Sequence, residues 1–434
     1  MYDFKQVRPH AWPGTNVSPR MNILVHDYAG HPAPVELSRE LARRGHRVTH
    51  AYFAADPGPK GQLQRAENDA EGLHFLPLGG DITYSKTNFI RRRSGDIAYG
   101  RALASHIRTT CPDIVISGNT PTESQERIVA ACIDTDVPFI YWCQDFYSIA
   151  ASRLLATKLP GPGHLIGGYY RFLERRQMRR ATKVVHITDA FCDQTDCWRI
   201  ARDKVSVIPN WGAIDKISVL ARSNSWAAAQ GMTAETRYLY SGTLALKHNP
   251  ALLAALANSL PDTQEVVLVS SGAGAETLLA AVASGEVKNM RVLPLQPFDL
   301  FDEVLASGDI LLAVIEREAG TFSVPSKILS YLCAGRPIVL AAPKDNLAAK
   351  ILLETGAGKV VPPEDIESFV SAARAYAQFP ETAVAAGKAG RAYAEKAFVL
   401  TPIADRFEQV FRAARRQTQN VQSLPGHRKH MRSD

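Results

Sequence analysis

The sequence lacks several features that would place it in a common class at once. Its 434 residues include only six cysteines, and none of them forms a close Cys-x-x-Cys pair. This spacing argues against a zinc site or a disulfide framework and favours a reducing, cytoplasmic setting. The sequence also lacks His-Glu-x-x-His, Gly-x-Ser-x-Gly and Walker A motifs. Protease, hydrolase and kinase interpretations therefore lose support.

Long apolar runs are missing as well. A membrane-spanning helix needs about 18 apolar residues, whereas runs such as 309–315 are only as long as a strand. The first twenty residues have no apolar core of the kind found in signal peptides, and we expect a disordered leader there. Any contact with a membrane would then be peripheral.

The charge is unbalanced towards the basic side. The formal net charge is +7, and much of the excess lies in residues 90–94, residues 169–183 and the C-terminal tail. Such a surplus favours acidic partners, namely nucleotides or phospholipid head groups. No motif that reads RNA or DNA is present, so we expect no nucleic-acid partner. The segment 169–183 could be a membrane-surface helix, or its arginines could be the solvated face of a packed helix.

Strand-sized apolar runs recur along the chain, with helix-patterned segments between most of them. They are NILVHD, RVTHAYF, LHFLPL, DIVISG, VPFIYW, KVVHIT and KVSVIPN in the first half, and RYLYSG, EVVLVSSG, NMRVLPL, DILLAVI, PIVLAAP and GKVVPP in the second. Strands that alternate with helices predict an α/β fold with parallel sheets covered on both faces. A polar stretch separates the two groups of strands.

This pattern predicts two doubly wound, Rossmann-like domains that face each other across a cleft. In such sheets, ligands bind at the carboxyl ends of the strands. The boundaries that we expect are a disordered leader (1–20), a first domain (21–212), a linker (213–235), a second domain (236–400), a C-terminal helix that packs back on the first domain (401–417) and a disordered basic tail (418–434).

Residues 242–247 follow a predicted strand of the second half. Gly242 would let a phosphate approach the backbone, Thr243 offers a hydroxyl donor and Lys247 offers a point charge for a diphosphate. The stretch is typical of an anion site between a strand and a helix. The alternative is a plain turn with a lysine in solvent.

A second candidate site begins at Ser326, which starts a predicted helix that Gly335 ends. A helix N-terminus favours an anion, whereas Lys327 in the first turn opposes the helix dipole. An incoming phosphate would explain the lysine. The alternative is a structural helix with Lys327 in solvent.

The first half offers weaker candidates. Gly30 and His31 follow the first strand, but a dinucleotide site would need two more glycines, so an NAD site is poorly supported. Asp145 follows a buried-looking strand and could orient a sugar hydroxyl or act on an acceptor proton. Its alternative is a carboxylate that caps a turn. No His/Cys cluster suggests a metal.

Several stretches resemble the family-4 glycosyltransferases of the GT-B fold: RGHRVTHAYF, KVSVIPNWGAID, YLYSGTLALKHNP, SVPSKILSYLCAGRPIV and TGAGKVVPPED. The branch they resemble is the bacterial one that builds surface polysaccharides, with colanic-acid and O-antigen fucosyltransferase-like members. The resemblance covers about residues 21 to 415. It implies a cytoplasmic, retaining enzyme that moves a sugar from a nucleoside-diphosphate sugar to a lipid-linked or polysaccharide acceptor, without metal or another cofactor.

The resemblance also implies roles for individual residues. The donor-binding candidates are Gly242, Thr243, Lys247, Ser326, Lys327, Ser330 and Glu318; the acceptor-side candidates are Gly30 and His31; the catalytic candidates are Lys247 and Asp145. The chain departs from the family at two places. Phe322 and Ser330 occupy the positions of a usual glutamate pair, so that Glu316 or Glu318 would have to replace the ribose-binding carboxylate. Gln144 and Asp145 stand where many relatives have a histidine.

Two further interpretations remain open at this point. One is a nucleotide-sugar epimerase of the same fold, which would need carboxylate acid–base groups near the sugar. The other is a non-catalytic subunit that binds a sugar nucleotide, which the replaced glutamates make conceivable.

Overall fold

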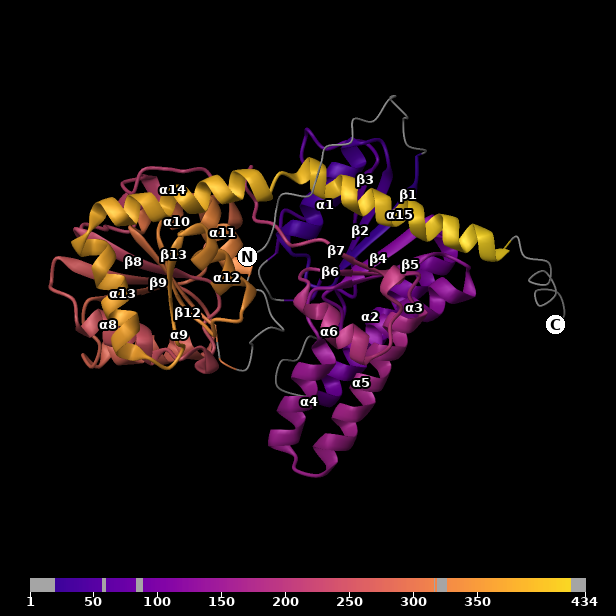
Figure 1. Ribbon diagram of the computed structural model, residues 1–434, viewed down its shortest axis with the longest axis horizontal. Coiled ribbons are helices and arrows are strands. Elements are labelled where there is room, and N and C mark those ends of the chain that lie inside the picture. Colours follow the sequence, from indigo (N-terminus) through magenta and orange to yellow (C-terminus); the bar gives the residue numbers. More distant parts are fainter. Residues whose placement is uncertain (1–19, 57–59, 83–88, 316, 318–325, 423–434) are drawn as a thin grey trace.

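The computed structural model describes residues 20–56, 60–82, 89–315, 317 and 326–422. It contains two α/β domains side by side, each built on one parallel sheet with helices on its faces (Figure 1). The prediction of two doubly wound domains is therefore confirmed. Each apolar run that was predicted to be a strand lies in one of the two sheets.

The first sheet has seven strands in the order β3-β2-β1-β4-β5-β6-β7. Its strands are β1 (Asn22–Asp27), β2 (Arg47–Phe53), β3 (Leu73–Leu78), β4 (Ile114–Gly118), β5 (Phe139–Cys143), β6 (Lys183–His186) and β7 (Val205–Val207). Its helices are α1 (Pro32–Arg43), α2 (Phe89–Thr110), α3 (Thr122–Asp134), α4 (Tyr147–Lys158), α5 (Pro162–Arg180) and α6 (Ala190–Cys197), with a 3-10 turn η2 (Arg202–Lys204).

The second sheet has six strands in the order β10-β9-β8-β11-β12-β13. Its strands are β8 (Thr236–Ser241), β9 (Gln264–Val269), β10 (Met290–Leu293), β11 (Ile310–Val314), β12 (Ile338–Ala341) and β13 (Gly358–Val361). Around it lie α7 (Ser225–Ala229), η3 (Leu246–His248), α8 (Ala251–Asn258), α9 (Ala273–Ala283), η4 (Phe298–Leu300), α10 (Phe301–Ser307), α11 (Ser326–Cys333), α12 (Leu347–Thr355), α13 (Ile366–Gln378), α14 (Pro380–Ala397) and α15 (Leu400–Gln422).

Both sheets reverse their strand order beside their first strand. In the first sheet the reversal lies between β1 and β4, and in the second it lies between β8 and β11. Loops diverge from the carboxyl ends of the strands at such switch points, which leaves room for a ligand. The sequence therefore builds two equivalent binding positions, one in each domain.

Local sequence explains the elements that frame these positions. The strand β1 is almost wholly apolar and buried up to its polar end at His26 and Asp27. The helix α11 ends before Gly335, whose φ of +66° is the left-handed geometry expected of a glycine after a helix. The predicted end of this helix is thus observed.

The chain passes between the domains at Trp211 and Gly212. Trp211 stacks on Trp142 of β5 with ring centroids 6.2 Å apart, so it belongs to the first domain. A Cβ at Gly212 would lie 2.7 Å from Cys333 Sγ of α11, so the chain touches the second domain at the next residue. The predicted linker 213–235 is a packed segment, because it contains α7 and buries Trp226.

The helix α15 returns to the first domain and lies along it (Figure 1). Its Glu408 accepts hydrogen bonds from His46 and Arg44, and its Phe407 packs edge-on against Trp142. The helix continues to Gln422, beyond the predicted boundary at residue 417. None of the helices that the structure describes is both long enough and apolar enough to cross a membrane.

Candidate active site

The carboxyl ends of the two sheets meet at one place, which two of the predicted residues mark. Asp145 follows β5 of the first domain, and Lys247 lies in η3 after β8 of the second. The two side chains are close enough to interact electrostatically, and both are exposed. The structure therefore brings together the two residues that the sequence singled out as catalytic candidates.

The environment of Asp145 is suited to proton chemistry. Surrounding protein raises the pKa of this carboxyl to about 6, while a backbone hydrogen bond at Phe146 and the charge of Lys247 pull it down. With a pKa of about 6, the carboxyl is mostly ionised at pH 7. A carboxylate poised in this range can accept a proton near neutral pH.

The first switch point carries a hydrogen-bonded cluster of three polar residues. Asp27, the last residue of β1, accepts hydrogen bonds from the His31 backbone (2.7 Å) and Asn119 Nδ2 (2.5 Å), and its Oδ2 lies 3.0 Å from His31 Nδ1. Burial alone would raise the pKa of Asp27, but His31 and the hydrogen bonds hold that pKa well below its usual range. The same pairing outweighs burial and raises the pKa of His31. The imidazole is therefore a good candidate for a charged donor.

Gly30 shapes the backbone of this loop. Its φ is +72°, and a Cβ at this position would lie 2.7 Å from Leu63 Cδ1. Its N–H donates to Asp27 O at 3.1 Å, which closes the turn that presents His31. The two predicted acceptor-side residues, Gly30 and His31, thus stand together at the first switch point.

Sequence reasoning missed Asp27 and Asn119. Asp27 ends β1 and Asn119 follows β4, the two strands that flank the switch point. Asn119 has a φ of +49°, a left-handed geometry that asparagine tolerates. Their polar side chains after the buried runs of β1 and β4 were a usable signal. Their hydrogen bond depends on β1 and β4 being neighbours in the sheet, and this strand order cannot be read from one sequence.

The second switch point begins with Gly242, whose φ is +117°. Its N–H donates to Val269 O at 3.0 Å, so this group is already occupied and is not available to a phosphate. The glycine contributes space instead, because a Cβ here would lie 3.3 Å from Lys327 Cε and Nζ. Thr243 beside it is exposed.

Lys327 fills that space from α11. Its Nζ lies 3.6 Å from the centroid of the Tyr240 ring and has no hydrogen-bond partner among the described residues. Burial lowers the pKa of the ammonium group to about 7. A buried lysine without a hydrogen-bond partner, next to a glycine turn, is a group that an anion would satisfy.

Tyr331 fixes the position of α11 against the end of β8. Its hydroxyl accepts from Ser241 N at 2.8 Å and donates to Ser241 O at 3.1 Å. The N-terminus of α11, with the exposed Ser326, is thereby tied to the strand that leads into Gly242. Ser330, one turn along, is partly exposed. Glu316, Glu318 and Phe322 lie outside the described residues, so the predicted donor role of Glu318 stays a prediction.

Gln144 has a partner just after β7, the last strand of its own sheet. Its Oε1 accepts from Asn210 Nδ2 at 2.5 Å, and Asn210 directly precedes Trp211 at the domain crossing. Gln144 therefore connects the loop of Asp145 to the segment where the chain crosses between the domains.

The described residues contain no group of three His, Cys, Asp or Glu side chains arranged to hold a metal ion. Asp134 and Asp136 do form an Asp-x-Asp sequence at the end of α3. That end of α3 leads into the amino end of β5, away from the switch point, and Asp134 accepts hydrogen bonds from Arg108. This pair is therefore poorly placed to bind a donor diphosphate.

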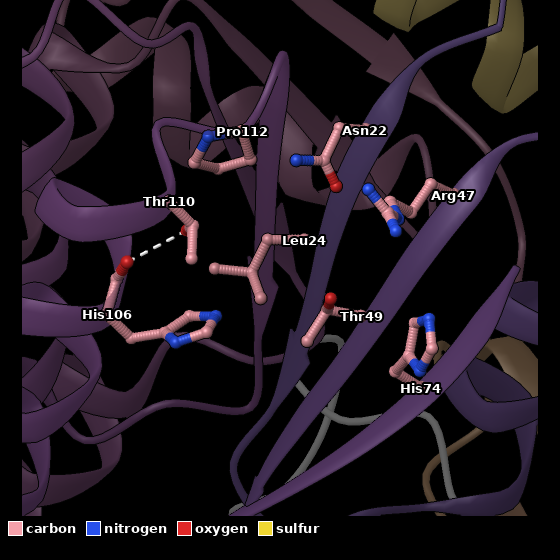
Figure 2. Close-up of a pocket in the computed structure, with 8 residues that line it drawn as sticks. All are labelled: Asn22, Leu24, Arg47, Thr49, His74, His106, Thr110 and Pro112. Carbon is pink, nitrogen blue, oxygen red and sulfur yellow. Dashed lines mark hydrogen bonds between the residues drawn. The ribbon is translucent and has the colours of Figure 1, made fainter.

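Figure 2 shows a cavity at the opposite end of the first sheet. It lies among the amino-terminal halves of β1, β2 and β3 and the last turns of α2, and its lining residues are Asn22, Leu24, Arg47, Thr49, His74, His106, Thr110 and Pro112. None of the predicted site residues lines it. The polar groups that converge on the domain junction are therefore a separate site.

A family comparison agrees with this geometry. Residues 31–211 match the model of the glycosyl transferase 4-like domain. The chain is also 25% identical over 256 residues to the putative colanic acid biosynthesis glycosyl transferase WcaI of Escherichia coli, a match that covers 58% of this chain and 62% of that relative.

Solved structures extend the likeness to both domains. Sucrose-phosphate synthase from Thermosynechococcus elongatus matches with a TM-score of 0.69 and 13% identity over 91% of this chain and 98% of its own. HepE of Anabaena, in complex with UDP and glucose, matches with a TM-score of 0.68 and 13% identity over 91% of this chain and 100% of its own. The predicted GT-B fold and the predicted resemblance to family-4 glycosyltransferases are therefore confirmed.

Proposed function

We propose that this chain is a glycosyltransferase that moves a sugar from a nucleoside-diphosphate sugar to a lipid-linked or polysaccharide acceptor in the synthesis of a bacterial surface polysaccharide. The observation that carries the proposal is that Asp145 of the first domain and Lys247 of the second lie close enough to interact electrostatically across the domain junction. The glycosyl transferase 4-like domain, the similarity to WcaI and the UDP complex of HepE support it.

The second domain would hold the donor. Departure of a nucleoside diphosphate leaves about two negative charges, and in this proposal Lys247, Lys327 and the N-terminus of α11 would stabilise them. Charges fixed in advance at such a place lower the barrier, typically by about 2.7–4 kcal/mol for one contact. Lys247 would serve the departing phosphate, while Lys327 would meet the diphosphate beside Gly242.

The first domain would hold the acceptor. Asp145 and the Asp27–His31–Asn119 cluster can orient sugar hydroxyls, because they offer both acceptors and a charged donor. We propose a retaining reaction in which the leaving phosphate helps to deprotonate the acceptor on the same face of the sugar. Such a step requires no protein nucleophile and no metal.

The acceptor would be met at the cytoplasmic face of a membrane. Basic and apolar residues in segments 90–94 and 169–183, at the start of α2 and along α5, would provide peripheral contact. Anionic lipid attracts each surface Lys or Arg by about 1 kcal/mol. Contact of the enzyme with the membrane would favour a lipid-linked acceptor over a soluble one.

A panel of donors tests the function. The protein is incubated with UDP-, GDP- and dTDP-sugars, with and without EDTA, while thermal stabilisation, release of nucleoside diphosphate and the fate of the sugar are followed. We expect one nucleotide to stabilise the fold and its sugar to be transferred or slowly hydrolysed, with EDTA having no effect. Interconversion to an epimer would instead favour an epimerase, and binding without turnover a non-catalytic subunit. Loss of activity with EDTA that Mg²⁺ or Mn²⁺ restores would overturn the metal-independent mechanism.

A further inference from the structure

The helices α4 and α5 form an antiparallel hairpin that projects from the first domain, away from its sheet (Figure 1). The hairpin starts directly after Asp145 and Phe146, at the carboxyl end of β5. Its far end, around residues 158–162, is the part that extends furthest from the domain in this view. Nothing in the proposed reaction uses this end.

The inside of the hairpin is built from small residues. A Cβ at Gly163 would collide with the carbonyl group of Leu155, and a Cβ at Gly167 would collide with the side chain of Ser152. The two backbones therefore approach each other closely through glycines spaced four residues apart on α5. Small residues at this spacing are typical of helices that pack together in lipid, where no hydrophobic effect drives large apolar side chains into the contact.

The outside of the hairpin carries the large apolar side chains. Five of them are about half exposed or more: Leu154 (55%), Leu159 (49%), Leu165 (80%), Tyr169 (46%) and Phe172 (57%). Two helices that pack in water ordinarily bury such residues between them. Here the arrangement is reversed, and a cluster of exposed apolar groups of this kind marks an interaction surface.

The charge of the hairpin indicates which kind of partner its exposed surface fits. From Tyr147 to Leu173 the sequence contains Arg153, Lys158 and Arg171 and no acidic residue. The next residue, Glu174, is buried, where it accepts hydrogen bonds from the Ser148 backbone and hydroxyl. The projecting surface is thus apolar and purely cationic, which complements an anionic bilayer.

The start of α2 adds to the same surface. Arg93 pairs with Glu123 at 2.9 Å, and Tyr170 of α5 donates to the same carboxylate at 2.7 Å. Ile90, 79% exposed, and two further arginines precede Arg93 on that helix. The basic segment at residues 90–94 therefore lies beside the middle of α5, as a collar nearer to the domain than the tip.

We propose that the tip of the α4–α5 hairpin inserts into one leaflet of an anionic bilayer, with the arginine collar at the head groups. The inference rests on the proposed function, because it supplies the route by which a lipid-linked acceptor reaches the site. The root of the hairpin carries Asp145, so insertion would hold this carboxylate close to the membrane surface. The tip would reach the acyl chains of one leaflet without crossing the bilayer, since neither helix is long and apolar enough to span it.

Flotation with phosphatidylcholine/phosphatidylglycerol vesicles measures the binding. The full chain should float with them at 150 mM and, more weakly, at 500 mM salt, because apolar insertion survives screening. Changing Leu154→Ser, Leu165→Ser and Phe172→Ser together should lower the partition coefficient by about tenfold or more, as expected for the loss of three large apolar groups. The matched control changes three similarly exposed residues of the second domain, Leu279→Ser, Leu353→Ser and Val384→Ser, and should leave it unchanged.

A tryptophan probe separates insertion from adsorption. Leu165→Trp should lose about half or more of its added fluorescence on vesicles with brominated acyl chains, because bromine quenches only groups within the hydrocarbon region. Leu279→Trp on α9 should lose none. Failure of the full chain to float, an unquenched Leu165→Trp, or a triple variant that floats normally would each overturn the proposal.

The outcome can be separated from that of the proposed function. Nucleoside-diphosphate binding and donor hydrolysis need no membrane, and the triple variant should retain both. Intact hydrolysis with no vesicle binding would reject the inserted hairpin while leaving the glycosyltransferase in place. Vesicle binding without any donor turnover would reject the enzyme and leave the hairpin. A hairpin-dependent dimer that ignores vesicles would show that a second copy of the chain covers this surface, and would overturn insertion.

Discussion

The two switch points of the molecule have the same topology but opposite chemistry. The one between β1 and β4 presents the carboxylate of Asp27 with His31, and a second carboxylate, Asp145, follows the next strand of that sheet, β5. The one between β8 and β11 presents Lys247 and Lys327, and its carboxyl-rich loop lies outside the described residues. The sheet order decides where a ligand binds, while the loop residues decide which ligand that is.

The difference also explains why two such domains are joined. In the proposed reaction, the described cationic groups of the second domain would stabilise a leaving diphosphate, and the described carboxylates of the first domain would act on an acceptor hydroxyl. The domain junction would bring both kinds of group to one sugar carbon. The contacts of Trp211 with Trp142 and of Gly212 with α11 show where the chain crosses from the first domain to the second.

Removal of the Lys247 charge should have the largest effect. We expect Lys247→Ala to lower turnover by about a hundredfold or more, the usual loss for one fixed group that stabilises developing charge. The control is Lys288→Ala, an exposed lysine before the amino end of β10. Both variants should melt at the same temperature as the parent. Near-normal turnover of Lys247→Ala at saturating donor would show that the second switch point does not act through this charge.

Asp145→Asn should have the next largest effect, and only on the acceptor side. Transfer should fall by about tenfold to a hundredfold, in the range of general acid–base groups, while nucleoside-diphosphate affinity stays within twofold of the parent, about 0.4 kcal/mol. In the parent, activity should decline as the pH falls through about 6, because protonation removes the carboxylate. The variant should lack this decline, whereas the control Asp203→Asn should keep it. Weaker diphosphate binding in Asp145→Asn would mean that both switch points hold the donor.

Much of this arrangement could be predicted from the sequence. Periodicity and the alternation of strands with helices gave both sheets, because buried parallel strands are nearly continuous apolar runs. The candidates Gly242, Ser326, Lys327 and Lys247 could be named because phosphate sites use local features, namely a turn, a helix start and a nearby cation; their roles stay predictions.

Features that depend on long-range pairing could not be predicted in the same way. The contact of Asp27 with Asn119 requires the order of β1 and β4, and the Tyr331 hydroxyl reaches Ser241 across 90 residues of sequence. Gly242 was expected to let a phosphate approach the backbone, and the N–H of this residue is bonded to Val269 O in the neighbouring strand. The inverted packing of α4 against α5 likewise became visible only when the two helices were placed together.

The smallest effect that we predict is a pH dependence at the second switch point. The pKa of Lys327 is lowered to about 7 because burial penalises its charge, so the group is largely neutral above pH 8 in the empty protein. A bound diphosphate would favour the charged form, and binding should therefore take up a proton. Affinity for nucleoside diphosphate should fall between pH 7 and 9, by at most about tenfold per pH unit for one proton. Most of the phosphate is already ionised at pH 7, so its own titration contributes little.

Lys327→Met should bind several-fold more weakly at pH 7 with a flatter pH profile, and Lys327→Arg should bind with a flat profile because arginine keeps its charge. Titration calorimetry in two buffers of different ionisation enthalpy measures the proton uptake directly, and uptake near zero in the parent would show that Lys327 does not meet the diphosphate.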